Sequence, residues 1–259
     1  MEKMLKVTII TPSFNQVDYL EATIQSVLAQ TYPNIEYFVI DGGSTDGSVD
    51  VIRAYQHELS GWVSEKDRGQ TDAINKGFNM ATGEIIAWLN SDDTYFPDAV
   101  EKAVAFLSSH PDVGLVYGDA NYIDQQGQVI GRFPAAQTSL HQLRRGYVHI
   151  PQQASFFRKA LWDRVGPLDP DFYFAMDYDL WVRLAAVSEI RYVNQTWANF
   201  RLHQDAKTIS ADDRCWPEML KVHYRNGGKW FSVIQMKYYL RKLAAPLITY
   251  QRKKRLTRR

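Results

Sequence analysis

Short apolar runs alternate with amphipathic stretches over roughly the first ninety residues of the chain. The runs are rich in β-branched and aromatic side chains, which favours strands, whereas the stretches between them carry apolar positions at helical spacing. The predicted strands cover residues 6–11, 35–41, 61–64 and 84–89. The predicted helices cover residues 17–29, 48–55 and 70–80. This alternation predicts an α/β fold in which helices flank a Rossmann-like, mostly parallel central sheet.

The second half of the chain continues the pattern with fewer elements. Strands are predicted over residues 113–119, 154–157 and 197–201, and helices over residues 161–165 and 178–186. The chain has 259 residues, of which 45% are hydrophobic and 23% charged, so it suits one large domain, or a domain and a tail. We therefore predict one domain over residues 1–228 and a tail over residues 229–259.

The charge distribution supports this division. The formal net charge is +1, but residues 229–259 hold 10 of the 30 basic residues and none of the 29 acidic ones, which leaves −9 on residues 1–228. In the tail, Trp230, Phe231 and Tyr238 interleave with the cations, as in a helix that lies on an anionic membrane surface. A solvated helical extension and a nucleic-acid contact are the alternatives. We expect a membrane surface, and no nucleic acid, as the partner of the tail.

Cysteine content and the length of apolar runs indicate the compartment. Cys215 is the only cysteine in the sequence, so the chain forms no internal disulfide, as expected in a reducing cytosol. Residues 1–6 lead into the first predicted strand without a long apolar signal core, and no later run approaches the length that crosses a bilayer. We expect a cytoplasmic protein, peripheral on the inner face of the cell membrane.

Polar clusters follow the first four predicted strands. They cover residues 11–15, 41–48, 65–69 and 90–93. Ligands of open parallel sheets bind beyond the carboxyl ends of the strands, so we expect these clusters to share one rim. Asp92 and Asp93 are either a solvated turn or a site for a hard divalent cation such as Mg2+ or Mn2+. The Asp41 carboxylate is a candidate acceptor for hydrogen bonds from a base or a ribose hydroxyl.

Two familiar nucleotide-binding motifs are absent from the sequence. There is no G-x-G-x-x-G at the first predicted helix and no G-x-x-x-x-G-K-[ST], which removes support for dinucleotide-binding and P-loop folds. Instead, four segments of the chain together resemble glycosyltransferase family 2. They cover residues 7–14, 39–48, 64–77 and 82–93. The resemblance covers roughly the first 205 residues. It implies a GT-A fold, a nucleotide-sugar donor, a divalent metal ion and inversion at the anomeric carbon.

The resemblance also divides the domain and assigns residues to the donor. It implies a nucleotide-sugar half at about residues 1–119 and an acceptor half at about residues 120–228. Residues that it places against the nucleotide sugar are Thr11, Pro12, Phe14, Asp41, Asp67, Arg68 and Asp92. Gly42 departs from the family pattern, because many relatives carry a second acidic residue at this position.

The metal motif and the acceptor half complete the implied site. Metal ligands implied by the resemblance are Asp93, as the expected direct ligand, with Asp92 and the late histidine His203. Asn90 replaces the aspartate that often leads this motif. Asp177 is implied as the base that deprotonates the acceptor, with Met176 in place of an adjacent acidic residue. A carboxylate at a helix start can also simply complement the helix dipole, worth about 0.3–1 kcal/mol. Candidate acceptor contacts are Gln152, Gln153 and Tyr173.

The expected activity follows from these assignments. We expect an inverting hexosyl- or N-acetylhexosaminyltransferase that uses Mn2+ or Mg2+ and a nucleotide sugar, with a UDP-sugar favoured. The acceptor is expected to be a glycan or a lipid-linked glycan in cell-surface polysaccharide synthesis. The alternatives are a nucleotidyltransferase that acts on sugar phosphates and a non-catalytic sugar-binding protein. The sequence does not specify the sugar, the linkage or the oligomeric state.

Overall fold

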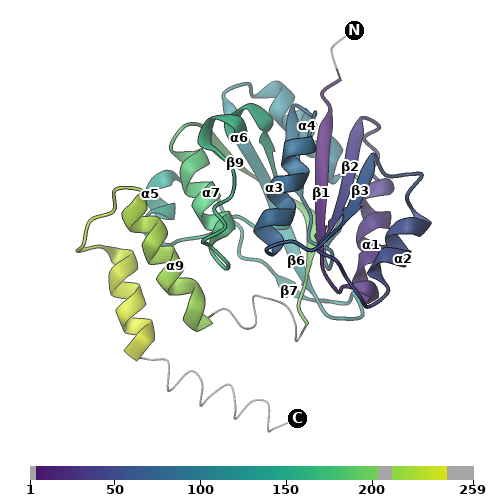
Figure 1. Ribbon diagram of the computed structural model, residues 1–259. Helices are drawn as coiled ribbons and strands as arrows, with labels where there is room; N and C mark the ends of the chain where they lie inside the picture. Colours follow the sequence, from purple (N-terminus) through teal and green to yellow (C-terminus); the bar gives the residue numbers. More distant parts are fainter. Residues whose placement is uncertain (1–3, 204–211, 244–259) are drawn as a thin grey trace.

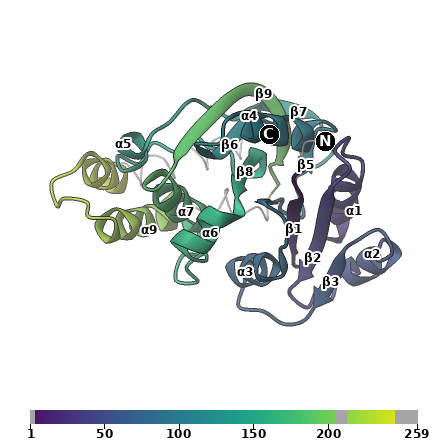
Figure 2. The same cartoon turned by 90° about the horizontal axis from the view of Figure 1, so that it is seen from above.

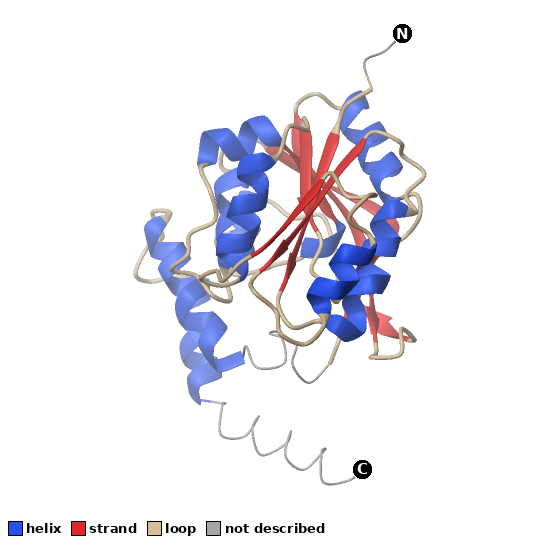
Figure 3. Cartoon of the chain, turned by 45° about the vertical axis from the view of Figure 1, so that its right-hand side comes forward, coloured by secondary structure: helices blue, strands red, loops and turns tan. Residues whose placement is uncertain are grey.

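The computed structural model describes residues 4–203 and 212–243. The strands of this part of the chain are β1 (Val7–Ser13), β2 (Ile35–Asp41), β3 (Gly61–Ser64), β4 (Ile85–Trp88), β5 (Thr94–Tyr95), β6 (Val113–Ile123), β7 (Val129–Arg132), β8 (Ser155–Arg158) and β9 (Glu189–Arg201). They form one sheet in the order β3-β2-β1-β4-β8-β6-β9-β5, and β7 pairs with β6 outside this path. Figure 1 shows β1, β2 and β3 side by side. The sheet lies at the centre of the molecule, between helices (Figure 3).

The first half of the sheet is parallel, as the alternation of strands and helices predicts. β1 pairs in parallel with β2 and with β4, and β2 pairs in parallel with β3. The second half is mixed. β8 runs antiparallel to both β4 and β6. β7 runs antiparallel to β6, and β5 runs antiparallel to β9. β6 and β9 pair in parallel. The predicted α/β class is confirmed, and the antiparallel strands belong to the chain after residue 93.

Helices cover both faces of the sheet. They are α1 (Val17–Leu28), α2 (Ser48–Ala54), α3 (Gln70–Met80), α4 (Ala99–Ser109), α5 (Leu140–Leu143), α6 (Lys159–Val165), α7 (Met176–Ala185) and α9 (Asp212–Arg225), with a 3-10 turn η1 (Gln152–Ala154). Successive strand residues point to opposite faces, so Ile10 of β1 packs in a core with α3 and α7, while Ile9 packs in a second core with α1 and α4. Viewed from above, the sheet runs between these two layers (Figure 2).

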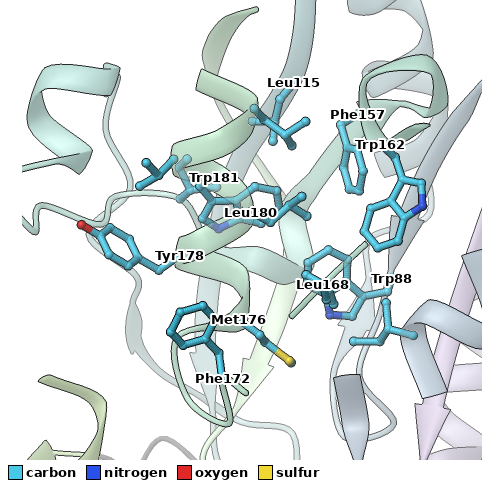
Figure 4. Close-up of a cluster of buried hydrophobic side chains, with 14 of the residues drawn as sticks. Trp88, Leu115, Phe157, Trp162, Leu168, Phe172, Met176, Tyr178, Leu180 and Trp181 are labelled. Atoms are coloured by element: carbon cyan, nitrogen blue, oxygen red, sulfur yellow. The ribbon is translucent and has the colours of Figure 1, made fainter. Parts of the chain in front are cut away.

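An aromatic core joins β4 to α7 (Figure 4). The indole of Trp88, the last residue of β4, stacks on the indole of Trp181 in α7, with ring centroids 5.7 Å apart and an interplanar angle of 16°. Phe157 of β8 packs edge-on against both rings. Such aromatic pairs contribute about 0.5–1.5 kcal/mol beyond the burial of their area. Because residues 90–93 follow Trp88 closely and Asp177 lies at the start of α7, this packing fixes the two regions to each other.

The described part of the tail packs onto the domain. Residues 233–243 are helical, Ile234 is fully buried, and Lys237 Nζ lies 3.1 Å from the ring centroid of Tyr147. Residues 244–259, which hold six of the ten basic residues of the tail, lie outside the described residues. Within the described ranges, no helix combines the length and apolarity needed to cross a bilayer. The division of the chain at residue 229 stays a prediction.

Candidate active site

The carboxyl ends of β1, β2 and β3 meet at one rim of the sheet. Ser13, Asp41 and Ser64 are register partners across these three parallel strands. β4 lies on the other side of β1. Leu89, the residue after β4, stays beside β1 because its backbone N–H donates a 2.9 Å hydrogen bond to Ile10 O. The polar clusters that follow these four strands therefore share one rim, where ligands of such sheets bind.

Asp41 organises the glycine-rich loop after β2. Its Oδ2 accepts hydrogen bonds from Gly43 N at 3.0 Å, Ser44 N at 2.9 Å and Ser64 Oγ at 2.7 Å, and its Oδ1 accepts one from Ser44 Oγ at 2.5 Å. The side chain is fully buried. An ionised carboxylate has about four acceptor positions, and these four bonds use most of them. Asp41 thus fixes the backbone of the loop after β2 at this rim. Its contact with a nucleotide base stays a prediction.

The other three residues assigned to the nucleoside pocket differ in exposure. Thr11 and Pro12 are buried, and Thr11 Oγ1 lies 2.9 Å from the hydroxyl of Tyr37. Phe14 is exposed beyond the end of β1. Phe14 is therefore the member of this set on which a base can stack without displacing protein atoms.

Asp67 gives a physical reason for the glycine at position 42. A Cβ at Gly42 would lie 2.8 Å from Asp67 Oδ2, so an acidic residue there would clash with this carboxylate and repel it. Asp67 Oδ1 accepts a 2.8 Å hydrogen bond from Gly69 N, which shapes the loop before α3. Arg68 is exposed and pairs with Asp72 at 3.2 Å. Exposed pairs contribute only about 0–1 kcal/mol, so Arg68 can exchange this partner for a phosphate at little cost.

Asp93 is the buried member of the acidic pair. Its Oδ1 accepts a 2.9 Å hydrogen bond from Arg201 N, and its Oδ2 accepts a 3.3 Å bond from Asn90 Nδ2. Burial raises the pKa of Asp93 well above its ordinary value, and the neighbouring Asp92 carboxylate raises this pKa further. Arg201 Nε also donates to the backbone carbonyl of Asp92 at 2.9 Å, so β9 holds both acidic residues. The carboxylate expected as the direct metal ligand is thus bonded to protein through both oxygens.

Asp92 and His203 bring a carboxylate oxygen and an imidazole nitrogen together. His203 Nε2 lies 3.0 Å from Asp92 Oδ2, and the Asp92 side chain is 18% exposed. Oxygen and imidazole donors suit Mn2+, and Mg2+ in nucleotide sites commonly takes one or two protein ligands with phosphate oxygens and water. Residues 4–203 and 212–243 contain no group of three or more His, Cys, Asp or Glu side chains placed to hold a metal ion. The Asp92–His203 pair fits the two-ligand case.

Asn90 uses both ends of its amide. Its Oδ1 accepts a 2.6 Å hydrogen bond from Gln70 Nε2, and its Nδ2 donates to Gln152 Oε1 at 3.2 Å as well as to Asp93. An aspartate at position 90 would lose this donor and place a second charge beside a buried carboxylate. The replacement of the leading aspartate is therefore consistent with the local hydrogen bonds.

The candidate base lies at the start of α7, and the residue before it contacts the start of α3. Asp177 is half-buried in the first turn of α7, and its Oδ1 accepts a 2.7 Å hydrogen bond from Tyr178 N. The adjacent Met176 Sδ lies 3.0 Å from Thr71 Oγ1 at the start of α3. The preceding residue, Gln70, is the one that bonds to Asn90. The start of α3 thus connects the base candidate to the acidic motif.

The predicted acceptor contacts do not all reach the surface. Tyr173 is exposed in the loop before α7, and Gln152 is half-buried beside Asn90. Gln153 is buried, and its Nε2 has no hydrogen-bond partner within the described part of the chain. Tyr173 is therefore the candidate that an acceptor can meet directly. The Gln152 amide is engaged at both ends, since its Nε2 donates to Trp88 O at 2.7 Å and its Oε1 accepts from Asn90 Nδ2 at 3.2 Å.

Two residues of the site have no motif of their own. Arg201 fixes both acidic residues, and the sequence indicated this region only through His203, two residues later. Glu218 of α9 accepts hydrogen bonds from the backbone just before α7, at Phe174 and Ala175. Nothing in the sequence pattern indicates that contact, since more than forty residues separate the partners.

Sequence comparison identifies relatives of this arrangement. A family described as Glycosyl transferase family 2 matches residues 8–176. The uncharacterized glycosyltransferase Rv1514c of Mycobacterium tuberculosis is 38% identical over 186 residues, which cover 71% of this chain and 70% of that protein. The uncharacterized glycosyltransferase alr2836 of Nostoc sp. is 28% identical over 225 residues, covering 80% and 68% of the two chains.

Solved structures share the fold at lower identity. S. aureus TarS, residues 1–349 in complex with UDP-GlcNAc, superposes with a TM-score of 0.69 at 16% identity and covers 91% of this chain and 72% of its own. The mannosyltransferase PcManGT from Pyrobaculum calidifontis, in complex with GDP-Man and Mn2+, gives 0.66 at 21% identity, with coverages of 92% and 70%. The architecture is that of GT-A glycosyltransferases, and the match over residues 8–176 shows that this chain belongs to glycosyltransferase family 2.

Proposed function

We propose that this glycosyltransferase moves a sugar from a nucleoside diphosphate sugar to a hydroxyl of a glycan or lipid-linked acceptor, with inversion at the anomeric carbon. The observation that carries the proposal is the connection of two chemical roles through the start of α3. Asp92 Oδ2 and His203 Nε2, which lie 3.0 Å apart, are two donor atoms for a cation. Met176, the neighbour of Asp177, contacts Thr71. The adjacent Gln70 bonds to Asn90 of the acidic motif. Sugar transfer needs a stabilised leaving group and an activated acceptor, and these residues can provide both.

The leaving nucleoside diphosphate gains negative charge as its bond to the sugar breaks. A divalent ion, Mn2+ or Mg2+, held by Asp92 and His203 would supply Lewis-acid neutralisation of that charge. Arg68 adds a positive side chain that can approach the diphosphate oxygens from the loop before α3. Arg201 would keep the acidic motif in place, because its backbone N–H bonds to the Asp93 carboxylate and its Nε bonds to the Asp92 carbonyl.

The acceptor hydroxyl is a weak nucleophile until a base removes its proton. We assign this role to Asp177, whose Oδ1 is oriented by the N–H of Tyr178. Attack from the face opposite the leaving group inverts the anomeric carbon in one displacement, so no nucleophilic carboxylate is required. Tyr173 and, after exchange of its hydrogen bonds with Trp88 O and Asn90, Gln152 would then contact the acceptor.

A donor screen tests this function. UDP-sugars are the favoured donors, since TarS binds UDP-GlcNAc, and GDP-mannose is included because PcManGT binds GDP-Man. We expect at least one donor to release its nucleotide slowly in the presence of Mn2+ or Mg2+, and chelation by EDTA to abolish this release. Absence of both release and calorimetric binding across the panel would contradict the proposal and favour a non-catalytic sugar-binding protein. Pyrophosphate release from a nucleoside triphosphate would instead indicate a nucleotidyltransferase.

We further propose that the tail holds the enzyme at an anionic membrane surface, on the inner face of the cell membrane, where a lipid-linked acceptor of cell-surface polysaccharide synthesis would lie. Three large apolar side chains support this: Trp230 is 65% exposed, Phe231 93% and Leu243 77%. Lys229 and Lys242 lie beside them in the sequence. Apolar side chains among cations match the two requirements of interfacial binding, which are buried apolar area and attraction to anionic lipid.

Substitution of two of these side chains tests the membrane proposal. Burial of one large apolar side chain is worth about 1.5–3 kcal/mol, so Trp230→Ser with Phe231→Ser should weaken binding to phosphatidylglycerol-containing vesicles at least about tenfold. Donor hydrolysis should not change. These substitutions are a cleaner test than deletion of residues 229–259, because deletion also removes the buried Ile234.

The matched control exchanges exposed apolar residues elsewhere. Val129→Ser with Ile130→Ser, on β7, removes two exposed apolar side chains outside the tail and should leave vesicle binding unchanged. Sedimentation with vesicles measures both variants. Equal sedimentation of the wild-type protein and the Trp230/Phe231 variant would show that the tail is a solvated extension.

A further inference from the structure

The loop before α7, residues 168–175, is held from two sides. On one side, α3 contacts it through Asn75, whose side chain donates to Leu168 O at 2.8 Å and accepts from Leu168 N at 2.9 Å. On the other side lies α9, whose Met219 and Val222 are buried in the same core as Phe172 of the loop. Because this loop leads directly into the helix that carries Asp177, whatever fixes the loop also fixes the candidate base.

Glu218 of α9 contacts the backbone just before Asp177. Its Oε2 accepts a 2.7 Å hydrogen bond from Phe174 N and a 2.8 Å bond from Ala175 N. Ala175 is the N-cap residue of α7 and has no side chain that could cap the helix. The first N–H groups of a helix lack partners within the helix and are stabilised by nearby negative charge. Glu218, from a different helix, therefore acts as the N-terminal cap that no side chain next to α7 in the sequence provides.

The position of Glu218 is itself well defined. The next residue, Met219, and Val222 one turn further on are buried in the core that also contains Trp181 of α7. Arg214, one turn before, places its guanidinium carbon 4.9 Å from the ring centroid of Phe174. Hydrogen bonds to a charged acceptor are stronger than those between neutral groups, so this pair of hydrogen bonds can hold the backbone against fraying of the first turn.

We propose that Glu218 is a positioning residue for Asp177, an inference that rests on the proposed function of Asp177 as the base. Glu218 pins the backbone two and three residues before Asp177 and so sets the direction of its carboxylate toward the acceptor. The family match ends at residue 176, so α9 contributes to the catalytic geometry from outside the matched segment. Displacement of a reacting group by about 1 Å can cost a factor of about 100 in rate, which sets the expected scale.

The experiment compares three substitutions at this position. Glu218→Ala removes both acceptor bonds, Glu218→Asp keeps the charge but shortens the side chain by one methylene, and Glu218→Gln retains a carbonyl oxygen that can accept both bonds. Lys221→Ala is the matched control, because it lies one turn further along α9 and loses only an exposed 3.2 Å pair with Asp171 and a contact with the Phe172 ring. Two readouts are used: amide hydrogen exchange over residues 173–178, and Mn2+-dependent hydrolysis of UDP-GlcNAc and GDP-mannose, in which water is the acceptor.

The expected pattern separates positioning from general stability. Glu218→Ala and Glu218→Asp should speed exchange over residues 173–178 and lower kcat about 10- to 100-fold, with the donor KM changed less than about twofold. Glu218→Gln should recover most of kcat, and Lys221→Ala should match the wild type. In the Asp177→Asn background, Glu218→Ala should cause no further loss, because the residue on which it acts is already inactive.

Three results would overturn the inference. They are unchanged exchange over residues 173–178 in both Glu218→Ala and Glu218→Asp, unchanged kcat despite faster exchange, and an additive loss in the Asp177→Asn background. If Glu218→Ala fails to fold, the contrast between Glu218→Asp and Glu218→Gln decides the same question. A wild-type protein that hydrolyses neither these donors nor the rest of the screened panel contradicts the proposed function itself, and with it the catalytic role of Glu218.

Discussion

Replacement of Asp177 by asparagine is expected to lower the rate of sugar transfer by about 10²- to 10⁴-fold, the usual contribution of a general base. The amide has the size of the carboxylate, and its Oδ1 can still accept the hydrogen bond from Tyr178 N, so α7 should begin as before. What the variant loses is the ability to take a proton from the acceptor. Nucleotide binding, measured by calorimetry in the presence of Mn2+, should change by less than about twofold.

The control for this variant is Asp171→Asn, which alters an exposed carboxylate six residues earlier in the same loop region. It should leave turnover close to that of the wild type, because its ion pair with Lys221 is solvated. Near-normal turnover in Asp177→Asn would remove Asp177 as the base and would require another group near the acceptor.

Replacement of Asp92 by asparagine is expected to weaken Mn2+-dependent donor binding and to lower turnover by about 10²-fold or more. An amide oxygen carries no charge to offset that of the cation, and Lewis-acid stabilisation of a leaving group is worth several kcal/mol. The fold should persist, because Arg201 binds the Asp92 backbone carbonyl rather than its side chain. A titration of Mn2+ followed by donor hydrolysis measures both effects.

Asp93→Asn is the informative partner of that variant. Burial disfavours the ionised form of Asp93, so removal of its charge offsets the exchange of one acceptor for an amide donor facing Asn90, and the free energy of unfolding should stay close to that of the wild type. Urea unfolding measures this. If Asp93→Asn abolished the dependence on Mn2+ while Asp92→Asn retained it, Asp93 would be the ligand, as the family resemblance implies, and the assignment to Asp92 would be wrong.

The parallel half of the fold could be predicted from the sequence because its signals are local. Residues 35–41 and 61–64 are predicted as strands, and β2 and β3 have these bounds. The clusters after these strands lie on one rim because the carboxyl ends of parallel strands meet. Periodicity and strand direction are enough for both conclusions.

The second half was less accessible to sequence reasoning. β5 has two residues, too few for any periodicity, and β7 pairs only at the edge of the sheet with four exposed residues. α4 and α9 were not predicted, although the buried positions of α4 have helical spacing. The antiparallel placement of β8 between β4 and β6 depends on long-range pairing, which no local pattern encodes.

The site shows the same division. Family resemblance names Asp92, Asp93 and His203, but it does not say which carboxylate is buried. That distinction arises from Arg201, whose backbone N–H and guanidinium reach the acidic motif from β9, more than one hundred residues away. Similarly, the departure at Gly42 is explained only by the distant carboxylate of Asp67.

The most direct test of the account is a crystal structure with Mn2+ and a nucleotide sugar, in which anomalous scattering locates the ion. We predict that the ion binds Asp92 and His203 together with the diphosphate, and that the Asp177 carboxylate faces the anomeric carbon from the side opposite the leaving group. An ion bound away from Asp92 and His203, or an Asp177 side chain directed away from the sugar, would contradict the central claim.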